Sequence, residues 1–367
     1  MIIEQILRGD ESNVNYRENY IRTITFDHPE WLHYDIHINP AMWAVYKGEL
    51  EEVVLKYPRS FRGYKKGGVD YADMQFSTKV DDNFVTDVWG CKWHYPLRYM
   101  DGVVVGHPLG DISKLDSFVP PVSPVPELNE EQWEAEIQNV KAAKQRGEIV
   151  SGGTEHGFLF LRHTYLRGFD NAMLDYADED SRQHLRRIYD MIIDYNMKLV
   201  EYHIKRGSDC MEFAEDLGTQ TGTIISPETF RKWVKPAYAA LMQPCKKAGM
   251  YIGLHSDGKT LDILEDQIEA GVDVVNPQDL CNGIDELAKR IKGKACIRLD
   301  IDRQSVIPCG TPKDIDDLIR EEMEKLGSPE GGLMFICGLY PPTPMQNVEA
   351  LAKALEKYST MWLPGIG

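Results

Sequence analysis

Residues 250–278 read MYIGLHSDGKTLDILEDQIEAGVDVVNPQ, and this stretch decides the fold class. An apolar run of strand length is followed by a polar turn, a segment of helical period and a second apolar run. Two apolar strands joined by a helix are typical of a βα unit, in which the strands run parallel. The stretch therefore predicts an α/β protein.

The same alternation extends along the chain from about residue 148. Four further strands are expected, at EIVSGGT (148–154), CMEFAED (210–216), ACIRLDI (295–301) and LMFICGL (333–339). Helices are expected between the strands, from Ser181 to about Arg206 and in the segments SPETFRKWVKPAY, IDELAKRIKG and TPKDIDDLIREEMEKLG. No glycine-rich nucleotide-binding motif follows any strand, so a (β/α)8 TIM barrel is favoured over an open dinucleotide-binding sheet.

Residues 1–125 are rich in aromatic residues and irregular in pattern. They are expected to form an elaborated N-terminal region that packs on the barrel and contributes to it. Residues 126–367 are expected to form the main part of the barrel, within one structural domain. A Pro-rich segment leads to Asn129, which is expected to cap a helix that continues through Ala143.

Composition and charge argue against several classes of protein. The 41 Lys and Arg residues against 58 Asp and Glu give a formal charge of -17, and no basic cluster suits nucleic acid or an anionic membrane. No apolar run of about 18 residues and no signal-peptide pattern occurs, so a cytoplasmic protein is expected. The seven cysteines never form a C-x-x-C pair, which indicates free thiols.

Polar residues follow several predicted strands, which is where a barrel keeps its active site. His255 and Asp257 follow MYIGL and point to the same side, because side chains alternate along a strand. They can share one ligand or metal ion, and an Asp–His pair that stabilises the turn is an equally good interpretation. Glu215 and Asp216 follow CMEFA, and either can act as acid, base or metal ligand, with a capping role as the alternative.

Cys337 ends the last predicted strand. It can complete a zinc site with imidazole and carboxylate groups, or it can be an inert buried thiol. The indole of Trp89 is expected either over the pocket mouth or in the core. Further polar and aromatic residues near strand ends are candidates for substrate contacts: Gln220, Asn276, Gln278, Asp302 and Tyr340.

The chain resembles the uroporphyrinogen decarboxylase superfamily, and especially its corrinoid-dependent methyltransferase branch. The matching stretches are LRGFDNAMLDYADED, DLGTQTGTIISPETFRKWVKPAY, GLHSDGKTLDILEDQIEAGVDVVNPQ and PPTPMQNVEALAKAL. The resemblance covers about residues 20–358. It implies a (β/α)8 barrel with its pocket at the carboxyl ends of the strands, in agreement with the strand pattern.

Two activities known in the superfamily are disfavoured by departures from its motifs. The decarboxylases use an arginine-bearing segment, R-Q-A-G-R-Y, where this chain reads HYDIHINPAMW. The branch that methylates thiols holds zinc with a His-x-Cys pair and a distant Cys. Here His255 and Cys337 match that pattern, but Asp257 replaces the middle Cys, which changes the charge and softness of the site.

The resemblance to the methyltransferases of O-demethylase systems implies transfer of a methyl group from a methoxylated aromatic, or another small donor, to the cobalt of a separate corrinoid protein. In this interpretation His255 and Asp257 hold zinc or the donor oxygen, Glu215 or Asp216 positions or protonates, and Cys337 completes the metal site. Glu215 is also a candidate ligand. The alternatives are a zinc-dependent methyl-corrinoid:thiol methyltransferase, a decarboxylase and a non-catalytic binding barrel. Superfamily members are often dimers, so a homodimer is consistent with the resemblance.

Overall fold

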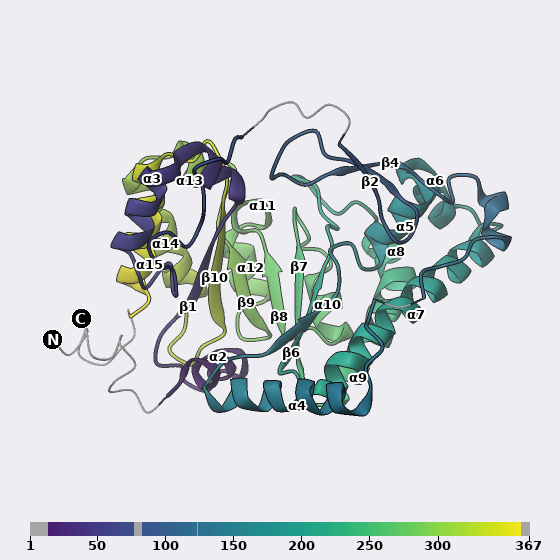
Figure 1. The fold of residues 1–367 in the computed structure, drawn as a ribbon, viewed down its shortest axis with the longest axis horizontal. Helices are drawn as coiled ribbons and strands as arrows, with labels where there is room; N and C mark the ends of the chain where they lie inside the picture. The colour runs from purple at the N-terminus through teal and green to yellow at the C-terminus, as the bar shows by residue number, and fades with distance from the viewer. Residues whose placement is uncertain (1–13, 77–82, 123, 361–367) are drawn as a thin grey trace.

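A curled parallel sheet of seven strands forms the centre of the structure, a computed structural model that describes residues 14–76, 83–122 and 124–360 (Figure 1). The strand order is β1-β10-β9-β8-β7-β6-β5, and all pairings are parallel. The strands are β1 (His33–Ile38), β5 (Ser151–Gly153), β6 (Cys210–Ala214), β7 (Tyr251–Ser256), β8 (Val274–Pro277), β9 (Cys296–Asp300) and β10 (Leu333–Leu339). Their carboxyl ends therefore meet at one edge of the sheet.

The structure confirms the predicted α/β class and all six predicted strands, but the eight-stranded barrel is present only in part. Among the described residues the sheet has seven strands, and its edge strands β1 and β5 are not paired with each other. The side chains of Asp35 and His37 on β1 line the interior and are nevertheless exposed. Within the described ranges the barrel is therefore open between β1 and the three-residue strand β5.

A small antiparallel sheet precedes β5 in the chain. It consists of β2 (Phe84–Thr86), β3 (Lys92–His94) and β4 (Val103–Gly106), in that spatial order. Figure 1 places this sheet near α5 and α6, at the end of the barrel where the central strands finish. The N-terminal region also supplies β1, which pairs with β10 at the edge of the central sheet.

Helices surround the central sheet (Figure 1). Helices α3, α14 and α15 pack together on one side, while α7 and α9 pack on the other. The long helices are α2 (Tyr16–Thr25), α3 (Pro40–Lys56), α4 (Glu130–Gln145), α7 (Arg182–Arg206), α9 (Lys235–Lys247), α14 (Pro312–Leu326) and α15 (Met345–Tyr358). The short helices and turns are η1 (Ile112–Asp116), α5 (Phe160–Arg167), α6 (Phe169–Ala177), α8 (Pro227–Thr229), η2 (Phe230–Val234), α10 (Leu264–Ala270), α11 (Asp279–Asn282), α12 (Ile284–Arg290) and α13 (Val306–Cys309).

The helix ends follow the sequence signals. Asn129 caps α4 by accepting a hydrogen bond from the backbone N–H of Gln132, whose side chain returns a bond to the Asn129 N–H. Ser181 precedes α7 as predicted, although its side chain makes no capping hydrogen bond, and Gly207 ends the helix in the left-handed conformation. Pro227 opens α8, a single turn that continues into η2 and α9.

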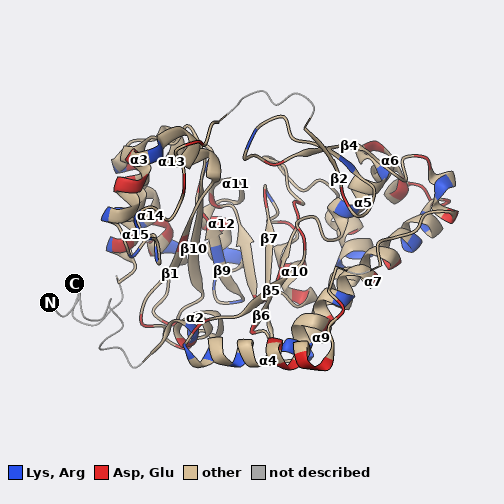
Figure 2. Ribbon diagram, viewed as in Figure 1, with Lys and Arg blue, Asp and Glu red and all other residues tan. Residues whose placement is uncertain are grey.

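Acidic and basic residues are interspersed along the outer helix α7 (Figure 2), so this helix offers no basic stripe for a phosphate backbone. Among the described residues, no helix combines the length and the apolar character that a membrane span requires.

His33, at the start of β1, makes the stability of the fold depend on pH. Burial, reinforced by the charge of Arg62, lowers the pKa of His33 to about 3. The unfolded chain takes up this proton at about pH 6.5, so the stabilising contribution is complete above that pH and is lost as the pH falls. We expect the protonation of His33 in the unfolded chain to lower the free energy of unfolding by about 2 kcal/mol when the pH falls from 7 to 5.

Urea unfolding of the native protein and of a His33→Phe variant at both pH values measures this contribution. The native protein should lose more unfolding free energy than the variant, by about that 2 kcal/mol. Equal losses in the two proteins would show that His33 does not titrate in this way.

Candidate functional site

His255 occupies the carboxyl end of β7, and a hydrogen bond fixes the orientation of its ring. Asn276 on β8 donates its side-chain N–H to the carbonyl of Arg298, so its Oδ1 is the atom that faces His255 Nδ1, at 2.8 Å. Nδ1 must therefore carry a proton and donate it to Asn276. This arrangement leaves Nε2 facing two carboxylates, at 3.3 Å from Asp257 Oδ1 and 4.0 Å from Asp216 Oδ1.

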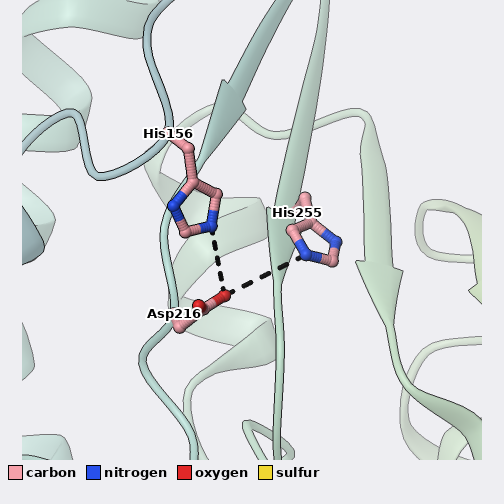
Figure 3. Close-up of side chains that lie close together, drawn as sticks. All are labelled: His156, Asp216 and His255. Atoms are coloured by element: carbon pink, nitrogen blue, oxygen red, sulfur yellow. Dashed lines mark ion pairs between the residues drawn. The ribbon is translucent and has the colours of Figure 1, made fainter. Parts of the chain in front are cut away.

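Asp216 and His156 complete a compact group around His255 Nε2. His156 lies in the segment between β5 and α5, and its Nε2 is 3.4 Å from Asp216 Oδ1. Figure 3 shows both imidazole rings turned toward the Asp216 carboxylate. One ligand atom of each of these three residues lies within 4.8 Å of the others, as do those of His255, Asp257 and Asp300. We call His156, Asp216, His255 and Asp257 the histidine–aspartate cluster.

Asp257 is held from two further sides. Gln278 donates Nε2–H to Asp257 Oδ1 at 3.1 Å and accepts the backbone N–H of Gly258 at 2.9 Å. Arg303 pairs with Asp257 Oδ1 and lies 3.5 Å from Asp300 Oδ2. The Asp257 carboxylate is therefore fixed in front of His255 Nε2.

The loops that carry Asp216 and Asp257 cross at two glycines. The Gly218 N–H donates to the Asp257 carbonyl, and the Asp257 N–H donates to Asp216 Oδ1. A Cβ built on Gly258, whose φ is +81°, would lie 2.3 Å from the backbone carbon of Gly218. The close crossing of the two loops brings the two carboxylates together, and it requires glycine on both sides.

The electrostatics favour charged histidines in this cluster. The contact with Asp216 raises the pKa of His156 above its ordinary value. Burial lowers the pKa of His255, but the contact with Asp257 and the charges of Asp257 and Asp300 outweigh it, and the net shift is upward. Burial also raises the pKa of Asp300, to about 6. The cluster can hold and release protons, or it can bind a divalent cation through imidazole and carboxylate groups.

Glu215 does not reach the cluster. Its side chain is fully buried, and it accepts hydrogen bonds from the backbone N–H groups of Leu159 and Leu161 and from the Tyr238 hydroxyl, at 2.6 Å. Burial raises the pKa of Glu215 to about 7 despite these bonds. Its carboxyl group anchors the chain ahead of and within α5, which is the capping alternative of the sequence analysis.

The structure places Cys337 and Trp89 away from the cluster. Ile336 and Gly338 line the barrel cavity, so the intervening Cys337 points to the other face of β10, where it is fully buried. Burial raises the pKa of its thiol well above the ordinary value, which disfavours the thiolate that a metal needs. Trp89 is 2% exposed and packs edge-on against Tyr195, so its indole lies in the core instead of at the pocket mouth.

The remaining predicted substrate contacts fall in two cavities. Tyr340 lines the barrel cavity, with the Arg303 guanidinium 5.8 Å from the centre of its ring. Gln220 and Asp302 line a second cavity of about 430 Å³ beside Arg303. The Asp302 carboxylate accepts three backbone N–H bonds from the turn that follows it, so it holds that turn in place.

The barrel cavity has a volume of about 560 Å³, within the range of small-molecule sites. It begins beside His255, Asn276 and Asp300 and reaches Tyr16 and Tyr20 of α2. Its lining includes Asp35, His37, Ile149, Ser151, Glu212, Phe213, Ala214, Arg298, Arg303, Ile336, Gly338 and Tyr340.

The sequence analysis missed two residues of this site, His156 and Arg303. His156 lies three residues beyond β5, in a loop with no motif of its own, and only the path of that loop brings it to Asp216. Arg303 follows Asp302 directly, so its place after a predicted strand was the available signal.

Comparison with known proteins relates more than half of the chain to one family. The family model of uroporphyrinogen decarboxylase (URO-D) matches residues 162–358, more than half of the chain. The methylcobamide:CoM methyltransferase MtaA of Methanosarcina barkeri is 25% identical over 158 residues, and its counterpart from strain Fusaro is 26% identical over the same length. These alignments cover 42% of this chain and 43% of the relatives, so the chain spans less than half of their length.

A solved structure shares the fold over almost the whole chain. The methyltransferase from Methanosarcina mazei has a TM-score of 0.60 and 15% sequence identity, and the match covers 94% of this chain and 99% of that one. At this level of identity the likeness supports the shared fold, and the chemistry has to be argued from the site.

Proposed function

Because the chain belongs to the uroporphyrinogen decarboxylase family, we propose that it is a methyltransferase that moves a methyl group from a small donor, a methoxylated aromatic, to the cobalt of a corrinoid carried by a separate protein. The observation that carries this proposal is the histidine–aspartate cluster at the strand ends, beside a cavity of about 560 Å³. The partial likeness to methylcobamide:CoM methyltransferases supports the same reaction class.

The difficult step in removing a methyl group from an aromatic ether is the departure of a phenolate. The cobalt(I) electron pair forms the new bond to carbon, the C–O bond breaks, and the oxygen keeps the bonding electrons and must be neutralised. His255 Nε2 is the atom that we assign to this oxygen. Asn276 fixes the ring, while Asp257 and Asp216 stabilise the imidazolium that supplies the proton.

A zinc ion fits the same residues. His156 Nε2, Asp216 Oδ1 and His255 Nε2 would hold it, because they form a borderline-to-hard donor set and the Asn276 bond leaves Nε2 of His255 as the ligand atom. Bound there, zinc supplies a Lewis acid for the ether oxygen. Without zinc the His255 imidazolium would meet the leaving group itself, and with zinc bound His255 would act as a ligand of the ion that does.

The structure offers less support for the alternative activities. A thiol methyltransferase of the known pattern needs Cys337 at the metal, and this thiol points away from the cavity. A decarboxylase acting on a substrate with several carboxylates needs free arginines. In the described part of the cavity, Arg298 is paired with Glu212 and Arg303 with Asp257 and Asp300.

Metal analysis separates the ligand set proposed here from a cysteine-containing one. Protein purified without chelator or histidine tag is expected to bind zinc near one equivalent, and His156→Ala and His255→Ala should lose it because each removes a ligand. Cys337→Ala should retain it. Loss of zinc from Cys337→Ala with retention in His156→Ala would contradict this ligand set.

The function itself is tested by release of the phenol product from methoxylated aromatics in the presence of cob(I)alamin. Product should appear only when both the corrinoid and the protein are present. Release of carbon dioxide from a carboxylated substrate without a corrinoid would favour the decarboxylase alternative.

A further inference from the structure

The barrel cavity has a second polar end that the proposed chemistry does not use. Glu212 on β6 and Arg298 on β9 form a two-pronged ion pair inside the barrel, with Nη2–Oε2 at 2.7 Å and Nη1–Oε1 at 3.3 Å. Gly253 on β7 leaves the space for this pair, because a Cβ there would lie 2.1 Å from Glu212 Oε2. The ion pair therefore fills the space in front of Gly253, where β7 has no side chain.

Two tyrosines of α2 line the same part of the cavity. No hydrogen-bond partner is found for the hydroxyl of Tyr16 or Tyr20 within the described ranges, and both rings line the cavity. Burial raises the pKa of both hydroxyls, so they stay protonated and can donate. We call Glu212, Arg298, Tyr16 and Tyr20 the cavity floor.

The cavity floor is close to neutral. The charge of Arg298 is balanced by Glu212, while Asp35 also lines the cavity and the Arg62 guanidinium lies 5.1 Å from the centre of the Tyr16 ring. Two negative and two positive groups leave no excess charge for an anion or a cation. A neutral group that both donates and accepts hydrogen bonds fits this floor best.

The register of the sheet gives the length of the ligand. His255 pairs with Asn276, and Asn276 donates to the carbonyl of Arg298, so the three residues lie side by side on β7, β8 and β9. The Arg298 guanidinium reaches across to Glu212 in front of Gly253, two residues before His255 on β7, so the ion pair lies roughly 7 Å along the strand from the His255 Cα. One aromatic ring with substituents at opposite ends spans such a gap.

We propose that the cavity floor binds a phenolic hydroxyl at the end of the donor opposite its methoxy group, so that the preferred donors are 4-methoxyphenols. The hydroxyl donates to Glu212 and accepts from Arg298 or a tyrosine, and the ring packs against Tyr16 and Tyr20. This inference rests on the proposed function, since it assumes that the methoxy group lies at His255.

Titration calorimetry tests the floor directly, because binding needs no corrinoid. Native protein should bind 4-methoxyphenol about tenfold more tightly than methoxybenzene or 4-methoxybenzoate. Tyr20→Phe should weaken binding of 4-methoxyphenol about fivefold and leave methoxybenzene unchanged. Tyr57→Phe, which removes a hydroxyl that donates to Glu349 Oε1 away from the cavity, is the matched control and should bind all three as the native protein does.

A change of charge sharpens the test. Glu212→Gln leaves the floor positive, so preference should move to 4-methoxybenzoate by about tenfold. If Glu212→Gln does not fold, the double variant Glu212→Gln/Arg298→Met, which removes both charges, takes its place in the test. This double variant should bind 4-methoxyphenol and methoxybenzene with equal affinity. Equal binding of these two ligands by the native protein, or no gain of benzoate affinity in a folded Glu212→Gln, would overturn the proposal.

The outcomes separate this inference from the proposed function. Selective binding of 4-methoxyphenol without methyl transfer from any donor would support the proposed specificity of the cavity floor and reject the proposed methyltransferase activity. Methyl transfer at equal kcat/KM from 4-methoxyphenol and methoxybenzene would reject the floor and leave the methyltransferase standing.

Discussion

Replacing His255 by alanine is expected to lower the rate of methyl transfer by about 10³-fold while the protein stays folded. The imidazole is the group that faces the leaving oxygen, and both carboxylates beside it act through it. Asn276 keeps its bond to the Arg298 carbonyl in the variant, so the strand ends retain their connection. The measurement is the initial rate of phenol release, alongside a circular dichroism spectrum of each protein.

His184→Ala is the matched control, because His184 is an exposed histidine of the outer helix α7. Its rate should equal that of the native protein. A His255→Ala rate within tenfold of the native value would remove His255 from the chemistry and leave the cluster a structural role.

Replacing Gly258 by alanine is expected to destabilise the protein by about 3 kcal/mol and to abolish activity in the fraction that folds. The residue has a φ of +81°, and its added Cβ would meet the backbone of Gly218 and not a side chain that can move aside. The two crossing loops would have to separate, which moves Asp216 and Asp257 away from His255. Urea unfolding at pH 7 measures the loss of stability.

Gly222→Ala provides the comparison, since Gly222 belongs to the other crossing loop, after β6, and a Cβ there meets nothing within 4 Å. That variant should unfold within about 0.5 kcal/mol of the native protein. Equal stability of Gly258→Ala and Gly222→Ala would show that the loops cross more loosely than the structure has them.

The strands β6 to β10 could be predicted because their buried apolar runs alternate with helices, and β5 because it follows the apolar residues Ile149 and Val150. β1 escaped prediction because its interior face is open to solvent, so HYDIHI places the polar Asp35 and His37 where a closed barrel would bury apolar residues. A search for apolar runs does not detect a strand whose inner face is exposed to solvent and carries polar residues.

The site was predictable where it depends on strand ends and not where it depends on loops. His255 and Asp257 follow from alternation along β7, and the same rule applied to β10 shows that Cys337 is out of phase with Ile336 and Gly338. The contact between His156 and Asp216 depends on the path of the loop after β5, which local sequence does not encode. Glu215 and Asp216 are adjacent, but Glu215 is buried against Tyr238 while Asp216 faces His156, and the sequence does not distinguish the two positions.

The most direct measurement of the central claim is a single-turnover experiment with a donor whose methoxy group carries three deuterium atoms. Native protein, reduced corrinoid and labelled donor are mixed, and the corrinoid is analysed by mass spectrometry. We expect a methylated corrinoid that retains all three deuterium atoms, formed in an amount equal to the phenol, and formed about 10³-fold more slowly with His255→Ala. An unlabelled or unmethylated corrinoid, with the donor consumed, would contradict the central claim.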